Sequence, residues 1–169
     1  NKEDQTGWEV YNACKNGGAI IATGHEHSYH RTKTLIDIEN QIVDPQWSEP
    51  NNLIVKEGST FVFVSGLGGH SIRDQERCLP DSYPYGCNHE WANIYTSDQD
   101  ANFGALFCTF NAGGQPNKAS CYFKNIDGKI IDVFGVTSLV STDITNTNPT
   151  NTELPERDSV MVDLSKTNL

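Results

Sequence analysis

The sequence predicts a mixed α/β fold of the α+β type, in which strands and loops greatly outnumber helices. Two observations lead to this prediction. One segment near the N-terminus carries large side chains at a helical spacing. Several short apolar runs elsewhere are bounded by Gly, Pro, Asn and Asp, which is typical of strands joined by turns. The length of 169 residues is compatible with one domain.

The predicted helix ends at about Asn16, because Gly17 and Gly18 follow it and interrupt a helix. Asp4 or Thr6 is suited to cap its first turn. Three of its residues recur at a spacing of three and should share its inner face: Trp8, Tyr11 and Cys14.

The strands predicted next are short. Residues 19–23 form an apolar run bounded by glycine, as expected of a buried strand. Residues 34–38 and 53–55 are further candidate strands, separated by a proline-bearing loop at 44–52. Residues 60–64 are almost wholly apolar, which predicts a strand that is buried on both faces.

A long loop and a meander are expected in the second half of the chain. Residues 70–100 are assigned to the loop, and loops of this length are usually functional or tied by disulfides. Residues 103–110, 119–126 and 129–138 should form three antiparallel strands, with Asp127-Gly128 marking the last turn.

The composition changes from Ser141 onward, where Thr, Asn and Pro dominate as in a linker. We therefore predict one domain portion over residues 1–138 and a tail or linker over residues 139–169. Residues 159–164 are strand-like, and an ordered tail would need its own domain or a neighbouring molecule to hold it.

The charge of the chain restricts its partners. It carries 12 Lys and Arg against 22 Asp and Glu, a formal net charge of −10. This balance argues against general binding to nucleic acid or to anionic membranes. A phosphate ester remains compatible as a substrate, because bound metal cations would set the local field. No apolar stretch approaches the roughly 20 residues of a membrane-spanning helix.

The cysteines suggest two disulfides. Cys108 and Cys121 flank a turn-rich connector and would lie opposite each other in a hairpin centred on residues 114–115. Cross-strand Cα separations of about 4.5–5.5 Å fall within disulfide range. Cys78 and Cys87 bracket a loop rich in Pro and Gly and form a second candidate pair.

Two such bonds would imply an oxidising environment, and hence a secreted, periplasmic or cell-surface protein. Buried free thiols are the alternative interpretation. Cys14 is left over, either as a packed thiol or as the partner of a cysteine in another segment.

His25 and His27 are the leading candidate metal ligands. They follow the apolar run 19–23, and alternate side chains of an extended segment face the same way. Neutral imidazole binds Zn, Fe, Mn or Cu, although a metal centre normally needs three or four protein ligands. A pair of polar loop histidines is the alternative interpretation.

Three ordered blocks carry a family resemblance. Gly24-His25-Glu26-His27-Ser28-Tyr29, followed by Arg31-Thr32, closely resembles the last motif, G-H-x-H, of the calcineurin-like metallophosphoesterases, which include the purple acid phosphatases. Residues 61–73 resemble the strand and glycine turn after that motif in bacterial secreted members. Residues 95–98 with 102–107 resemble their closing hairpin. The resemblance spans about residues 8–138.

This resemblance implies the C-terminal half of a four-layer αββα sandwich. The family builds its site from five motifs, and the four that precede G-H-x-H are missing from the sequence. His25 would bind one metal ion and His27 the other, in a pair of divalent or mixed-valence ions (Fe, Zn or Mn). The remaining ligands, and the groups that hydrolyse a phosphate ester, would come from an N-terminal half in the same polypeptide or another chain. The chain alone should be inactive, with no catalytic residue of its own.

Further residues are expected near this site. Tyr29 and Arg31 should pack and hydrogen-bond around the metal loop, and Arg31 as a clamp for phosphate is a less favoured reading. His30 is expected behind the ligands or facing the substrate. His70 and Arg73 follow a glycine turn that the resemblance places near the site, although a solvated loop is equally compatible. The glycines at 66–69 lack the Lys-Ser/Thr of a phosphate-binding loop.

A non-enzymatic function is the second hypothesis. A surface or assembly protein could use the phosphoesterase scaffold for interaction alone. The two hypotheses differ in whether the missing motifs exist in the parent gene or in a neighbouring polypeptide.

Overall fold

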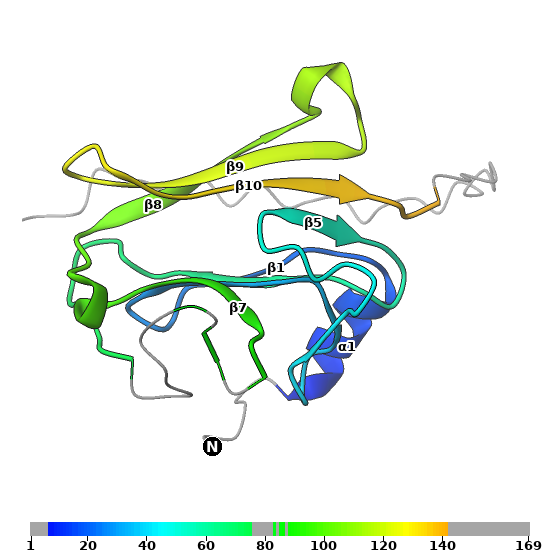
Figure 1. The fold of residues 1–169 in the computed structure, drawn as a ribbon, viewed down its shortest axis with the longest axis horizontal. Coiled ribbons are helices and arrows are strands. Elements are labelled where there is room, and N and C mark those ends of the chain that lie inside the picture. Colours follow the sequence, from blue (N-terminus) through cyan, green and yellow to red (C-terminus); the bar gives the residue numbers. More distant parts are fainter. Residues whose placement is uncertain (1–6, 76–82, 84, 87, 142–169) are drawn as a thin grey trace, which may run out of the picture.

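The computed structural model describes residues 7–75, 83, 85–86 and 88–141. This part of the chain is a mixed α/β structure dominated by strands, in agreement with the predicted α+β class (Figure 1). Its helices and strands are α1 (Trp8–Asn16), β1 (Ile21–Thr23), β2 (Tyr29–Thr32), β3 (Leu35–Asp37), β4 (Ile42–Val43), β5 (Asn52–Val55), β6 (Val62–Ser65), β7 (Trp91–Tyr95), η1 (Ser97–Gln99), β8 (Gly104–Phe110), η2 (Ala112–Gly114), β9 (Lys118–Asn125) and β10 (Ile130–Ser138).

Two four-stranded sheets face each other. The first has the order β1-β6-β2-β7, with β1 parallel to β6 and the remaining pairs antiparallel. The second has the order β5-β10-β9-β8, with β5 parallel to β10 and the rest antiparallel. A short β3-β4 ribbon completes the set. Figure 1 shows α1 on the side of the first sheet that faces away from the second sheet.

Alternation of side chains along one strand divides the core between these layers. Phe61 and Phe63 face the second sheet, where they join a cluster built on Leu53 and Phe134. Val62, between them, packs with the cluster under α1 instead. Burial of both faces in this way supplies most of the stabilisation of a layered fold, at about 25 cal/mol per Å² of apolar surface.

The predicted C-terminal end and inner face of the helix are confirmed. α1 ends at Asn16, and three of its residues pack against Ile21, Leu35 and Ile38: Trp8, Tyr11 and Cys14. Gly7 holds the N-cap position and makes no side-chain hydrogen bond there. The expected caps, Asp4 and Thr6, lie outside the described residues.

The predicted meander is confirmed, whereas two strands were missed. β8, β9 and β10 follow the predicted runs to within one residue, and Gly128 adopts a φ of 84° in the last turn. β2 lies in a segment for which no strand was predicted, and β7 lies within the predicted loop 70–100. The sequence of β2 did not indicate a strand, because one of its inward-facing side chains is a charged arginine.

The prediction that residues 60–64 form a strand buried on both faces is confirmed only in part. Thr60 and Phe61 are buried, whereas every residue of β6 is only partly buried. β1, whose run looked interior, has β6 as its one neighbour in the described part of the chain, and Ala22 is exposed. The physical reason is an open space between β1 and β6 on one side and β8 on the other.

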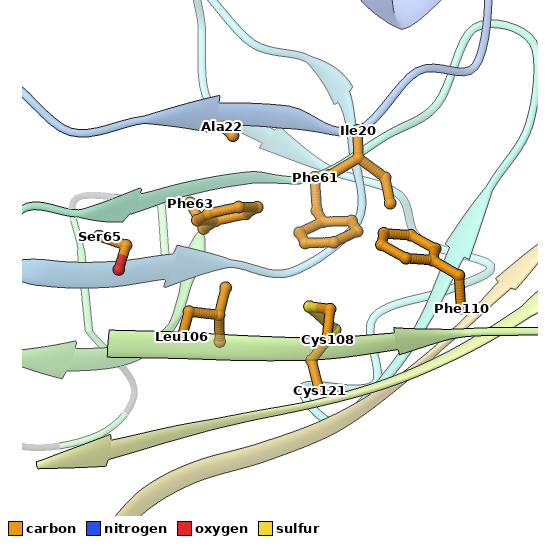
Figure 2. A pocket seen from close by; sticks show the side chains of 9 residues that line it. All are labelled: Ile20, Ala22, Phe61, Phe63, Ser65, Leu106, Cys108, Phe110 and Cys121. Atoms are coloured by element: carbon orange, nitrogen blue, oxygen red, sulfur yellow. A yellow bond between two sulfur atoms is a disulfide. The ribbon is translucent and has the colours of Figure 1, made fainter. Parts of the chain in front are cut away.

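This space is an apolar groove of about 390 Å³ between the two sheets. Its walls are Ile20, Ala22, Phe61, Phe63, Ser65, Leu106, Cys108, Phe110 and Cys121. Figure 2 shows the β8 side chains Leu106, Cys108 and Phe110 directed toward the phenylalanines of the first sheet. Phe110 remains 65 % exposed, so the inner face of β8 is incompletely covered.

The predicted bond between Cys108 and Cys121 is present. The two residues are direct partners in the β8–β9 register, with their Cα atoms 4.2 Å apart. Cys14 is a free thiol. The other candidate pair, Cys78 and Cys87, lies outside the described residues.

We predict that alkylation of the denatured, unreduced chain will modify Cys14 and leave Cys108 and Cys121 untouched. Cross-strand neighbours in register are held in bonding position by the hairpin itself. Peptide mapping by mass spectrometry should recover the two cysteines as one linked species, which separates after reduction. Alkylation of either one before reduction would contradict the assignment.

Candidate functional site

The two candidate ligands lie in the loop that joins β1 to β2. Residues 25–28 form a succession of bends, with His25 exposed and His27 partly buried. The alternation argument of an extended segment therefore does not apply to this pair. The directions of the two imidazoles depend instead on what holds the loop in place.

His27 is held by a segment that follows the glycine turn after β6. Nδ1 of His27 lies 2.6 Å from Oγ of Ser71, and its ring centroid lies 5.4 Å from that of His70. The backbone N–H of Arg73 donates to the carbonyl of His27 at 3.0 Å. Residues 70–73, here named the strap, thus contact His27 through both its side chain and its backbone.

Arg73 also pairs with the acidic residue of the loop. Its Nε lies 3.3 Å from Oε1 of Glu26, with the two side chains 51 % and 35 % exposed. A pair this exposed contributes at most about 1 kcal/mol. The strap is fixed at its far side as well, because the N–H of Ser97 donates to the carbonyl of Arg73 at 2.9 Å.

Gly66 allows the loop to lie directly against the end of β6. A Cβ atom at this position would collide with the backbone of Glu26 and crowd the carbonyl of Gly24. The N–H of Gly66 donates to the carbonyl of Ser28 at 2.9 Å. Glycine is thus required here by a close approach of two backbones.

The three blocks that carry the family resemblance meet at this edge of the first sheet. Hydrogen bonds join Gly66 to Ser28 and Arg73 to both His27 and Ser97, and the N–H of Gly104 donates to the carbonyl of Leu67 at 3.0 Å. Segments far apart in sequence therefore form one continuous structure around the histidine loop.

Tyr29 and Arg31 face away from this loop, toward the second sheet. The Tyr29 hydroxyl donates to Oδ2 of Asp132 at 2.6 Å. Nε and Nη2 of Arg31 donate to the two oxygens of the same carboxylate at 2.6 and 2.9 Å. Burial, and then the Asp132 carboxylate, raise the pKa of Tyr29 above its ordinary value, so this hydroxyl stays a proton donor.

The expectation that Arg31 could clamp a phosphate is corrected by its surroundings. Its guanidinium is fully buried and 4.2 Å above the ring of Phe134. Nη1 donates to the carbonyl of Pro50, and Nη2 also reaches Oδ1 of Asn51. A side chain with these partners joins the two sheets and has no surface to offer a substrate.

His30 occupies the opposite face of β2. Its ring meets the ring of Trp91, on β7, edge to face at a centroid distance of 5.1 Å. Alternation along β2 accounts for this position, since Tyr29 and Arg31 on either side point to the second sheet.

The donor set near the loop fits a metal only in part. Two imidazoles suit Fe, Zn or Mn. No group of three or more His, Cys, Asp or Glu side chains among the described residues could hold an ion. Further ligands would therefore have to come from elsewhere. Sequence reasoning also passed over Ser71, which lies 44 positions beyond His27 and shows no local signal of contact with it.

No model of a known protein family, no curated protein and no solved structure matches this chain. Within the described ranges, none of the helices has the length and apolar character needed to cross a membrane. The functional argument accordingly depends on the motif, the geometry of the loop and general chemistry.

Replacement Gly66→Ala should destabilise the site strongly. We expect the free energy of unfolding to fall by about 1–3 kcal/mol, because the new methyl group displaces the backbone of Glu26. Urea denaturation would measure the change. Gly68→Ala is the matched control, since no atom lies within 4 Å of its Cβ position, and it should change stability by less than about 0.5 kcal/mol. Equal effects of the two changes would contradict the packing described for Gly66.

The substitution Asp132→Asn should strongly lower the free energy of unfolding. It leaves the buried Arg31 charge without its counterion, a loss of about 3–5 kcal/mol. The exposed Asp127→Asn should cost less than about 1 kcal/mol when measured by the same denaturation experiment. A loss at Asp132 no larger than that at Asp127 would show that the ion pair does not hold the sheets together.

Proposed function

We propose that this chain is the C-terminal part of a secreted, dinuclear metal-dependent phosphoesterase that hydrolyses phosphate esters. The observation that carries the proposal is the Gly24-His25-Glu26-His27 loop, held against the strap by hydrogen bonds to both the side chain and the backbone of His27. The Cys108–Cys121 disulfide favours an oxidising compartment.

The location of the loop supports an active-site role. β1 and β6 are parallel, with Thr23 paired to Val64, so their carboxyl ends reach the same edge of the sheet. The histidine loop follows β1 at this edge, and the glycine turn follows β6. Ligands of α/β sheets bind outside the carboxyl ends of parallel strands.

In this proposal His25 is a ligand of one metal ion and His27 of the other. A pair of Fe, Zn or Mn ions, when bound, supplies an activated water and neutralises charge on the phosphoryl oxygens. The residues of this chain hold the ligands and shape the edge of the site. His70 and Arg73 are exposed beside the loop and are suited to contact the phosphate ester.

The four-layer αββα sandwich, with its N-terminal half as a partner, is also part of the proposal. β1 and β8 each have one paired neighbour in the described structure, and the apolar groove lies between them. Unpaired backbone and uncovered apolar side chains favour the addition of further strands. An N-terminal half, in the same polypeptide or another chain, would bring these strands together with the missing metal ligands.

A surface or assembly protein built on the same scaffold is the second candidate. The groove favours it, and so do the outer edges of β1 and β8, which are unpaired in the described part of the chain. These features can bind a polypeptide whether or not a metal centre is completed. Under this alternative, the histidine loop would have no role in binding metal.

The test compares histidine variants in the natural protein that contains this chain, with any polypeptide that completes it. We expect His25→Ala and His27→Ala each to reduce bound metal and to lower kcat/KM for p-nitrophenyl phosphate by more than about 100-fold, since even the outer partners of metal ligands are worth roughly 10–100-fold. The exposed His89→Ala is the matched control and should change neither quantity.

Metal content, measured by atomic spectrometry, separates the two candidates. The phosphoesterase is supported if the wild-type protein binds metal and hydrolyses the substrate, and if His25→Ala reduces the amount of bound metal. A natural protein that lacks the other four motifs and binds no metal would contradict it and favour the scaffold.

A further inference from the structure

We propose that residues 159–164 of this chain add to the outer edge of β8 as a further strand and turn three apolar side chains into the groove between the sheets. The inference goes beyond the proposed function and does not rest on it, because it uses neither the histidine loop nor a metal. It rests on the backbone of β8, the walls of the groove and the point at which the chain leaves the described part.

The backbone of β8 offers unpaired hydrogen-bonding groups along its outer edge. In an antiparallel pair, close partners that exchange no hydrogen bonds alternate with wider partners that do. Cys108 and Cys121 are of the close kind, with Cα atoms 4.2 Å apart. The N–H and C=O groups of Leu106, Cys108 and Phe110 therefore point away from β9. None of these groups has a backbone partner among the described residues, so this edge can accept a further strand.

The same three residues of β8 also line the groove with their side chains. A strand that bonds to their backbone groups would carry every second side chain on the same face of the sheet. Those side chains would enter the groove opposite Ile20 and Ala22, which form part of its other wall (Figure 2). Ala22 and Phe110 are exposed in the described structure, so an added strand would cover apolar surface on both walls.

Residues 159–164 have the alternation that this edge requires. Val160, Val162 and Leu164 would share the face toward the groove, and Met161 and Asp163 would share the other. The remaining long stretches outside the described residues are dominated by polar residues and proline: 1–6, 76–82, 142–158 and 165–169. Residues 159–164 are therefore the segment of this chain that fits an apolar groove.

The chain leaves the described part close to the groove. The N–H of Leu139 donates to the carbonyl of Val55 at 2.8 Å, and a Cβ atom at Gly18 would collide with the side chain of Val140. Gly18 lies two positions before Ile20, a wall of the groove. Residues 142–158 can extend over roughly 55 Å, at about 3.3 Å per residue, whereas β8 is roughly 24 Å long. The segment can therefore reach either end of β8, and the tether raises its local concentration there.

The experiment compares Val162→Asp with Met161→Asp in the natural protein that contains this chain. The two variants add the same charge at adjacent positions, which alternation places on opposite faces of the added strand. Hydrogen exchange, measured by NMR, reports whether the amides of Leu106, Cys108 and Phe110 are paired. We expect Val162→Asp to accelerate their exchange by more than about 10-fold, because it would bury a carboxylate in the groove. Met161→Asp should retain slow exchange.

Two further measurements complete the test. The amide of Phe123, on β9, should exchange at the same rate in all three proteins, which shows that the sheet stays folded. In the wild type, nuclear Overhauser effects should connect the methyl groups of Val162 to the ring of Phe61. Fast exchange at the three β8 amides of the wild type would overturn the inference, as would the absence of these effects.

Two other results would assign the groove to a different occupant and would also overturn the inference. Slow exchange that survives Val162→Asp would show that another polypeptide pairs with β8. Nuclear Overhauser effects seen only between differently labelled molecules would show that a second copy of the chain does so. The measurements require no metal, so their outcome is independent of the proposed phosphoesterase activity.

Discussion

The buried ion pair between Arg31 and Asp132 joins the two sheets and determines how β2 is oriented. Removing both charges from water is costly. The cost is offset because the guanidinium also hydrogen-bonds Pro50 and Asn51 and lies over the ring of Phe134. Tyr29 shares the same carboxylate. Once Tyr29 and Arg31 face the second sheet, alternation sends His30 to the other side and fixes where the preceding loop enters β2.

The histidine loop depends on this arrangement at one end and on the carboxyl end of β6 at the other. β2 and β6 are antiparallel neighbours, and Tyr29 is paired with Ser65. The loop must therefore return across the glycine turn, where Gly66 makes room for its backbone. Packing inside the molecule and the position of an exposed histidine are thus parts of one constraint. A substitution that breaks the ion pair would therefore alter the histidine loop, although the substituted residue lies outside that loop.

Local sequence patterns predicted the parts of the structure whose causes are local. The spacing of Trp8, Tyr11 and Cys14 identified the inner face of α1, and hairpin symmetry paired Cys108 with Cys121. β2 escaped prediction because the partner of Arg31 lies 101 positions away, so its charge looked like a loop signal. The location of the histidine loop after a strand was predictable from the apolar run that precedes it. Its contact with Ser71 depends on how β6 and the strap return to it.

The location of the disulfide allows it to report on the groove between the sheets. Cys108 and Cys121 form part of the wall of the apolar groove, and Cys108 is exposed there. Any polypeptide that settles into the groove will cover the sulfur atoms and slow their attack by a thiol, since exchange requires access to sulfur. The bond is consequently a chemical reporter of occupancy: its rate of reduction measures whether the space between the sheets is empty or filled.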